Sequence, residues 1–176
     1  MIPDFKSEGF VLDIGGGGEG VIGRLKGRDV VAIDNYKQEL EDSVEGPLKI
    51  VMDAKELMFL DETFNTATAF FTMMYIKNTE DQQKVLSEIW RVLKPRGRLH
   101  IWDLDLDELP QTDKEFYLVK LRYLVGTFET GTGYGMRWPT EPHSETYYKQ
   151  LAEKTGFQLL SAERVKHTFY HLYSKP

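Results

Sequence analysis

The sequence predicts an α/β fold, a doubly wound and mostly parallel sheet with helices on both faces. Over the first hundred residues, short apolar runs alternate with amphipathic polar segments. Strands that alternate with helices in this way form parallel β-α-β units with right-handed crossovers. The chain has 176 residues, 41% of them hydrophobic, and no repeat or linker-like segment. Because this length supports one hydrophobic core, we expect a single domain over residues 1–176.

Turn residues divide the first half of the chain into elements. The apolar run Val11–Ile14 predicts a strand, which the following glycines stop. Residues 20–26 predict a short helix with its apolar side chains on one face, and residues 37–43 predict a polar helix. Further strands are expected at residues 30–33, 48–52, 66–73 and 98–104.

The clearest helix is expected from Thr79, which is a good N-cap residue with Gln82 three positions later, as in a capping box. Apolar residues then keep a helical spacing from Val85 to Leu93. The following residues 94–97 (KPRG) predict the end of this helix.

Beyond residue 105 the pattern changes. Residues 117–125 alternate in polarity and predict a strand, with residues 127–136 as its hairpin partner. A helix over residues 113–124 remains an alternative, because short apolar runs fit both structures. Residues 144–154 predict a helix ended by Gly156, and residues 157–165 and 168–173 predict two final strands in a hairpin.

Composition excludes several classes of function. The net charge of −6 and the pI near 5.3 argue against nucleic acid or an anionic membrane as the main partner. There is no cysteine, so disulfides, thiolate metal sites and a cysteine nucleophile are excluded. No apolar run approaches the roughly 18 to 20 residues that span a bilayer. Residues 1–10 do not resemble a signal peptide, and a soluble cytoplasmic protein is expected.

The stretch VLDIGGGGEG at residues 11–20 is the most informative motif. Strand, glycines and helix in this order let a ligand reach backbone N–H groups at a helix N-terminus. Gly15, Gly17 and Gly20 satisfy the dinucleotide fingerprint, and Asp34 follows 19 residues after Gly15, where it would bond a ribose. A P-loop is excluded, because Gly20 is followed by Val21 rather than by Lys.

Two acids favour another adenosine ligand over a dinucleotide. Asp13 precedes the glycines, where its charge would repel a pyrophosphate and attract an ammonium group. Asp53 and Ala54 follow the third predicted strand, where a carboxylate can accept from an adenine amino group and a backbone N–H can donate to the ring. An ammonium, a ribose and an adenine together describe S-adenosylmethionine better than NAD.

The motif order resembles that of the class I S-adenosylmethionine-dependent methyltransferases, of the small-molecule, type 11 kind. Residues 11–17 (VLDIGGG) resemble the first motif, residues 32–34 (AID) the second-strand acid and residues 51–54 (VMDA) the adenine motif. Residues 64–71 (FNTATAFF) resemble the fourth-strand segment, with Asn65 where Asp is usual. Residues 86–97 (LSEIWRVLKPRG) resemble the helix and turn that follow. Glu19 departs from the family, since a glycine usually stands there.

The resemblance implies a Rossmann-like, seven-stranded sheet with an antiparallel last strand, and S-adenosylmethionine as cofactor. It implies no particular catalytic residue, because methyl transfer from a sulfonium rests largely on alignment. The family's N-terminal helices are not seen before residue 11, so an open site is expected unless another chain or an insertion at residues 107–143 covers it. The cofactor-binding residues that it implies are Asp13, Gly15, Gly16, Gly17, Asp34, Asn35, Asp53, Ala54, Phe70 and Phe71.

Substrate-binding residues are expected at the carboxyl ends of the fourth and fifth strands and in the insertion. The candidates are Tyr75, Asp103, Tyr134, Arg137 and Trp138. For each of them, packing or solvation is an alternative explanation, and the lone His143 fits a structural role better than that of a base. Asp103, Asp105 and Asp107 have the spacing of calcium ligands, but Glu108 and Lys114 do not complete that motif, so no metal site is predicted.

The sequence therefore predicts methyl transfer from S-adenosylmethionine to a small-molecule acceptor. Two alternatives stay open: an NAD-dependent oxidoreductase, and a protein that binds S-adenosylmethionine without catalysis. A homodimer is possible, and neither a nucleic acid nor a membrane is expected as a partner.

Overall fold

The computed structural model describes residue 2, residues 4–109 and residues 112–176. It contains a seven-stranded sheet with the strand order β3-β2-β1-β4-β5-β9-β8, which confirms the predicted α/β class. Strands β1 to β5 are parallel, and β9 runs antiparallel to β5 and pairs with β8 in a hairpin. The strands of this sheet are β1 (Val11–Ile14), β2 (Val30–Asp34), β3 (Leu48–Val51), β4 (Phe64–Phe70), β5 (Leu93–Leu104), β8 (Gln158–Val165) and β9 (Thr168–Ser174).

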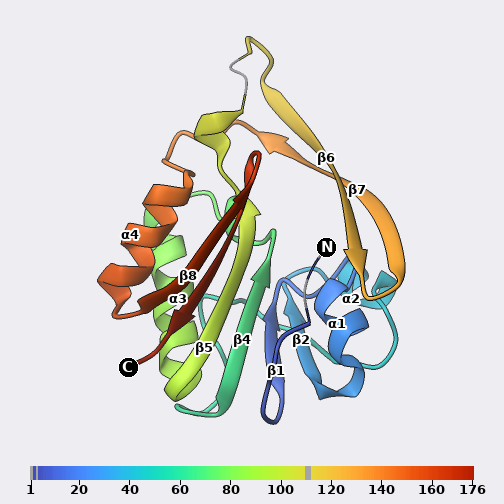
Figure 1. Ribbon diagram of the computed structural model, residues 1–176, viewed down its shortest axis with the longest axis vertical. Helices are drawn as coiled ribbons and strands as arrows, with labels where there is room; N and C mark the ends of the chain where they lie inside the picture. Colours follow the sequence, from blue (N-terminus) through green and yellow to red (C-terminus); the bar gives the residue numbers. More distant parts are fainter. Residues whose placement is uncertain (1, 3, 110–111) are drawn as a thin grey trace.

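The four α-helices cover the two faces of this sheet (Figure 1). They are α1 (Val21–Lys26), α2 (Lys37–Asp42), α3 (Thr79–Val92) and α4 (Glu145–Thr155). Leu12 and Ile14 of β1 belong to the core under α3 and α4, whereas their neighbour Val11 belongs to the core on the opposite face. Successive side chains of a strand point to opposite faces. The central strands are therefore buried on both faces, which requires an apolar run.

Strand β4 is shorter at its end than the predicted strand at residues 66–73. Its last residue is Phe70, which pairs with Trp102 of β5. Phe71 has a φ of 50°, so the backbone turns there, and Met73 lies in a 3-10 helix at Met73–Tyr75. Phe71 and Thr72, which were expected to continue the strand, instead carry the chain away from the sheet.

The N-terminus of α3 also differs from the prediction. The N-cap residue is Asn78 and not Thr79, because Asn78 Oδ1 accepts a hydrogen bond of 2.8 Å from the backbone N–H of Asp81. Gln82 does not complete a capping box, since its side chain turns inward and donates to the carbonyl of Ile76 at 2.8 Å. Asn and Thr both cap helices well, so sequence alone did not decide between neighbours.

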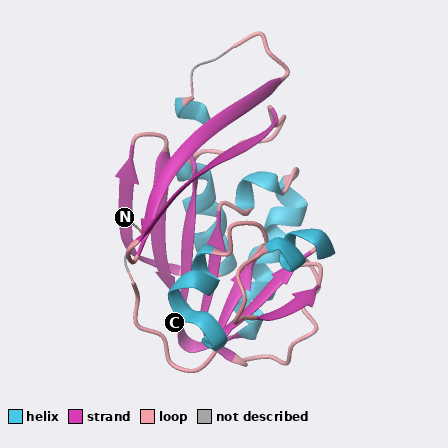
Figure 2. Ribbon diagram, turned by 90° about the vertical axis from the view of Figure 1, so that its right-hand side faces the viewer, coloured by secondary structure: helices cyan, strands magenta, loops and turns pink. Residues whose placement is uncertain are grey.

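The open alternative at residues 113–136 is settled in favour of a hairpin. Strands β6 (Phe116–Val125) and β7 (Phe128–Arg137) form a two-stranded sheet of their own, separate from the main sheet. The hairpin begins beyond the carboxyl end of β5 and arches down over the side of the molecule where α1 and α2 lie (Figures 1 and 2). Near the tip, the backbone N–H of Ile2 donates to the carbonyl of Leu124 at 2.9 Å.

In the part of the chain that the structure describes, no helix combines the length and the apolar character needed to cross a membrane.

Candidate active site

A cleft of about 780 Å³ lies where β1, β2 and β4 end, between the glycine-rich loop and the β6–β7 hairpin. Carboxyl ends of parallel strands are the usual place for ligands in a doubly wound sheet. Residues 15–20 of the loop form one wall, and Gly133, Tyr134 and Met136 of β7 form part of another. The insertion expected on the substrate side therefore contributes directly to this cleft.

All five glycines of the loop have a structural reason. A Cβ on Gly16 would lie 2.8 Å from the Cβ of Ala32, and a Cβ on Gly17 would lie 2.6 Å from that of Glu39, so neither position has room for a side chain. The other three have the positive φ values that L side chains rarely adopt: Gly15 (68°), Gly18 (59°) and Gly20 (56°).

Asp13 is a buried carboxyl group in the wall of the cleft. Its side chain is 2% exposed, and its Oδ1 accepts a hydrogen bond of 2.6 Å from the hydroxyl of Thr68 on β4. Burial raises the pKa of Asp13 from 3.8 to about 7, with the nearby charge of Asp34 acting in the same direction and the Thr68 bond opposing it. A cation bound beside Asp13 would relieve this desolvation and favour the ionised form.

The acid at the end of β2 stands beside the glycines as predicted. Asp34 and Asn35 both line the cleft, and Asp34 Oδ1 accepts a hydrogen bond of 2.9 Å from the backbone N–H of Tyr36. Asp34 Oδ2 faces the loop, because it would lie only 2.9 Å from a Cβ on Gly17. One oxygen of this carboxylate is thus fixed by the backbone, and the other is directed at the loop.

At the end of β3, the structure separates two residues that were predicted to act together. Ala54 lines the cleft, whereas the exposed Asp53 is not among its lining residues. Asp53 Oδ1 accepts from the backbone N–H of Lys55 at 2.9 Å, which fixes the turn after the strand. Asp53 Oδ2 lies 3.7 Å from Lys55 Nζ.

Uncharged aromatic and thioether side chains form the wall on the hairpin side. The Phe71 and Tyr134 rings stack, with centroids 4.9 Å apart and an interplanar angle of 13°. The Phe70 ring meets that of Phe71 edge-on at 4.8 Å. The members of this aromatic wall are Phe70, Phe71, Tyr75, Tyr134 and Met136. Such a surface suits a flat, weakly polar molecule better than an anion.

Three predicted substrate residues lie outside the cleft lining. Asp103 is fully buried behind it, where its two oxygens accept from the backbone N–H groups of Met74 at 3.2 Å and Leu104 at 2.8 Å. Burial raises the pKa of Asp103 to about 7. Arg137 pairs with Glu115 across the hairpin at 2.6 Å. Trp138 packs on the Tyr117 ring, with the two centroids 5.0 Å apart.

His143 has the structural role that its isolation suggested. Its imidazole is buried, with Nδ1 2.6 Å from the Tyr148 hydroxyl and Nε2 3.2 Å from Gln82 Nε2. Burial lowers the pKa of His143 to about 4, so the ring is neutral at pH 7. Trp102 is also buried, as expected of a core residue.

Sequence reasoning missed Glu19 as a residue of the site. Glu19 lines the cleft and hydrogen-bonds to two hydroxyls of β7, those of Thr132 and Tyr134, the latter at 3.2 Å. The only signal in the sequence was that an acid stands where the resembling family has a glycine. Its partners are more than a hundred residues away, so spacing could not have identified them.

The charge of the cleft is predominantly negative. Five acidic residues line it, and only two lysines. The acids are Asp13, Glu19, Asp34, Glu39 and Asp81. Carboxylates around the glycine-rich loop repel a pyrophosphate and attract a ligand that carries positive charge.

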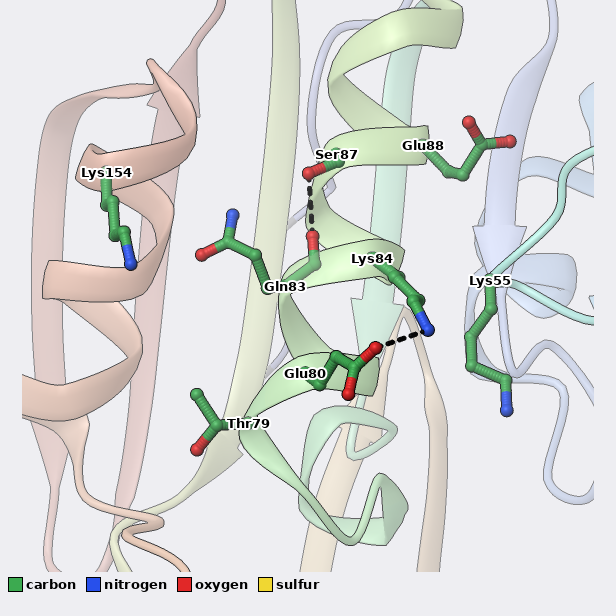
Figure 3. A pocket seen from close by; sticks show the side chains of 8 residues that line it. All are labelled: Lys55, Thr79, Glu80, Gln83, Lys84, Ser87, Glu88 and Lys154. Atoms are coloured by element: carbon green, nitrogen blue, oxygen red, sulfur yellow. Dashed lines mark hydrogen bonds and ion pairs between the residues drawn. The ribbon is translucent and has the colours of Figure 1, made fainter.

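A second depression, of about 580 Å³, runs along the outer side of α3 between Lys55 and Lys154 (Figure 3). Its side chains form ordinary pairs of a solvated helix, such as the ion pair of 2.8 Å between Glu80 and Lys84 (Figure 3). It lies on a helix surface and not at the strand ends. The first cleft, at the strand ends, is therefore the candidate active site.

Comparison with known proteins gives one family. Residues 12–101 match the family model described as Methyltransferase domain. The chain is 28% identical over 123 residues to the sterol 4-C-methyltransferase strm-1 of Caenorhabditis elegans, an alignment that covers 68% of this chain and 32% of that protein. It is 31% identical over 157 residues to the ubiquinone/menaquinone biosynthesis C-methyltransferase UbiE of Brucella canis, which covers 86% of this chain and 53% of that protein. The chain thus spans about half the length, or less, of these curated relatives.

Solved structures show the same fold. A protein of Pyrococcus horikoshii has a TM-score of 0.69 at 20% identity, covering 96% of this chain and 84% of that one. A SAM-dependent methyltransferase from Methanosarcina mazei has a TM-score of 0.67 at 18% identity, covering 98% and 94%. At these identities the likeness concerns the fold.

Proposed function

The chain belongs to the methyltransferase domain family, and from this premise we propose that it transfers a methyl group from S-adenosylmethionine to a small-molecule acceptor with a flat, weakly polar body. The observation that carries the proposal is the cleft itself. A buried acid and a glycine-rich loop stand on one side of it, and the aromatic wall stands on the other.

The residues present fit the cofactor. Asp13 offers a buried carboxyl to an ammonium group, and Gly16 and Gly17 line the cleft beside it at positions where a side chain has no room. Asp34 at the end of β2 offers a carboxylate to ribose hydroxyls. We assign Asn35 and Ala54 to the adenine side of the cleft. Asp53 has this role only if its turn rearranges, because it does not line the cleft.

When bound, S-adenosylmethionine supplies an electrophilic methyl group on a sulfonium. The chain's own residues align the two reactants and exclude water between them, and such alignment lowers a barrier by roughly 7 to 11 kcal/mol at best. Asp13 and the glycine loop hold one end of the cofactor. Phe70 and Phe71, directly after β4, border the region where cofactor and acceptor meet.

The acceptor class follows from the aromatic wall. Its residues supply ring faces, one thioether and two phenol hydroxyls, and no charged side chain. The names of the relatives, a sterol methyltransferase and a methyltransferase of ubiquinone/menaquinone biosynthesis, agree with an apolar ring-bearing acceptor.

Titration calorimetry with S-adenosylmethionine, S-adenosylhomocysteine and NAD tests the cofactor. The proposal expects binding of the first two at micromolar concentrations and not of NAD, and the opposite result refutes it. Release of S-adenosylhomocysteine is then measured over a panel of sterols, phenols and hydroquinones, with organic anions as the contrasting set. Turnover of anions alone would refute the acceptor class, and tight cofactor binding without turnover of any compound would indicate a binding protein.

A further inference from the structure

The β6–β7 hairpin is a two-stranded sheet that pairs with no strand of the main sheet among the described residues. An isolated hairpin is marginally stable in water, so its position depends on its contacts with the rest of the protein, which include the backbone hydrogen bond from Ile2 to Leu124 as well as side-chain contacts. The hairpin turns one face toward the core: Tyr117, Tyr123 and Tyr134 are buried, while the outward Phe116 and Leu118 are exposed.

Glu19 joins the middle of this hairpin to the glycine-rich loop. Its Oε1 accepts from the hydroxyl of Thr132, and its Oε2 accepts from the hydroxyl of Tyr134. One carboxylate therefore binds two neighbouring positions on the inner face of β7. Hydrogen bonds to an ionised group are stronger than those between neutral groups.

The backbone of Glu19 is held as firmly as its side chain. Its carbonyl accepts a hydrogen bond of 3.1 Å from Arg24 Nε on α1, and glycines with positive φ flank it on both sides. The guanidinium of Arg24 lies 4.5 Å from the centroid of the Phe128 ring at the tip of the hairpin. Loop, helix and hairpin meet at this one residue.

Tyr134 connects this junction to the acceptor half of the cleft. Its hydroxyl binds Glu19 while its ring stacks on Phe71. If the hairpin moved away from the loop, the stacked pair would separate and the aromatic wall would lose the members that β7 supplies.

The closed hairpin buries polar groups that have no partner. The Tyr117 and Tyr123 hydroxyls and Trp138 Nε1 are buried without a hydrogen-bond partner among the described residues. Buried donors without an acceptor carry a desolvation cost that opening of the hairpin removes. The closed position therefore carries this cost, and Glu19 holds the hairpin in it from the middle of β7.

We propose that Glu19 is a positioning residue that latches the β6–β7 hairpin onto the glycine-rich loop, so that the hairpin is a lid over the acceptor half of the cleft. Because the latch stands on the loop that is proposed to hold the cofactor, cofactor binding and lid closure stabilise one another. This second part rests on the proposed function, and the latch itself does not.

The absence of cysteine allows spin labels to be placed at will. Cysteines introduced at the exposed positions Arg28, after α1, and Glu129, on the hairpin, report the distance between the two parts by pulsed electron paramagnetic resonance. In the full chain without ligand, we expect a dominant short distance. Glu19→Ala should increase the ratio of long to short distances about tenfold, as expected for loss of charged hydrogen bonds.

Three further variants distinguish a latch from a general loss of charge or of folding. Glu19→Gln keeps one acceptor oxygen for two hydroxyls and should give an intermediate ratio. Tyr134→Phe keeps the ring on Phe71 and removes one hydroxyl, so it should shift the ratio in the same direction by less. Glu39→Ala removes another carboxylate from the same cleft that has no described bond to the hairpin, and should leave the distances as in the parent. Urea unfolding shows that each variant is folded.

The proposal is overturned if the distribution of label-to-label distances in Glu19→Ala superimposes on that of the parent. It is also overturned if Glu39→Ala broadens the distribution as much as Glu19→Ala does. Saturating S-adenosylhomocysteine should narrow the distribution of label-to-label distances in the parent and not in Glu19→Ala. If S-adenosylhomocysteine binds the parent without narrowing this distribution, the coupling between cofactor binding and lid closure is refuted. If S-adenosylhomocysteine fails to bind the parent at all, the proposed function fails, while the comparison without ligand still decides the latch.

Discussion

The buried carboxyl of Asp13 is expected to lower the stability of the ligand-free protein, and Asp13→Asn measures by how much. Burial raises its pKa from 3.8 to about 7. The gap between these two values corresponds to about 4 kcal/mol. Between pH 4 and 7 the unfolded chain holds fewer protons at this group than the folded chain. The free energy of unfolding is therefore highest at low pH, where Asp13 is protonated in both states. It falls as pH rises through 7, because the folded protein must then hold a buried charge.

The variant removes the charge and keeps an oxygen that can accept the hydrogen bond from Thr68. It also introduces an amide NH₂ group whose buried hydrogens need acceptors, at a cost of about 1–3 kcal/mol. At pH 8, Asp13→Asn should therefore stabilise the protein by about 1–3 kcal/mol. At pH 5 Asp13 is protonated in the folded protein, so much of the cost of burying its charge is absent. The change in the free energy of unfolding on Asp13→Asn should therefore be less favourable than at pH 8 by about 2–3 kcal/mol.

Urea unfolding of the parent and the variant at both pH values measures these differences, and titrations shared with other groups cancel between the two proteins. Asp103→Asn is the matched control, since Asp103 also has a pKa raised by burial to about 7. Both of its oxygens accept backbone N–H groups, and the amide nitrogen of Asn cannot replace one of these acceptors. Asp103→Asn should therefore show a similar pH dependence, but a lower free energy of unfolding than Asp13→Asn at every pH. S-adenosylhomocysteine should bind at least tenfold more weakly to Asp13→Asn. A stability difference that does not change with pH would refute the reasoning.

Further predictions concern the loop, the ribose acid and the core. Asp34→Ala should weaken S-adenosylhomocysteine binding at least tenfold, about 1.4 kcal/mol, and unchanged affinity in calorimetry would contradict the ribose assignment. Gly17→Ala would place a Cβ 2.9 Å from Asp34 Oδ2 and should destabilise the protein by about 1–3 kcal/mol with loss of cofactor binding. Gly131→Ala, whose Cβ has nothing closer than 3.4 Å, is its control and should be nearly neutral in urea unfolding. Tyr148→Phe leaves the buried His143 without its partner at 2.6 Å and should cost about 1–3 kcal/mol in the same assay; no loss would show that the bond is not stabilising.

The order of the elements could be predicted from the sequence because each central strand is a short apolar run bounded by turn residues. Local backbone conformation was harder to predict from the sequence. Phe71 and Met73 have the composition of a strand, yet a positive φ at Phe71 ends β4 before them. Similarly, Asn78 and Thr79 are adjacent residues of equal capping ability, and only the position of the Asp81 N–H decides which one caps α3.

In the candidate site, the loop and the β2 acid could be predicted because they are contiguous with their strands. Glu19 could not, since its role exists only when Thr132 and Tyr134 have been brought to it by folding. Arg137 was expected to face the substrate because of its aromatic neighbours. In a hairpin, however, successive residues alternate between faces, and Arg137 pairs with Glu115.

The two walls of the cleft are encoded in separate parts of the chain. The loop and the acid at β2 come from the first fifth of the sequence, whereas the arching hairpin is one uninterrupted segment, Phe116–Arg137. Under the proposed function, exchange of that segment should change which acceptors fit, while the strands at the other wall keep their register. A graft of this kind has one requirement outside the segment: the new hairpin needs hydroxyl donors where Thr132 and Tyr134 now meet Glu19. New acceptor specificity is therefore accessible through a single cassette, at the cost of preserving one pair of side-chain contacts.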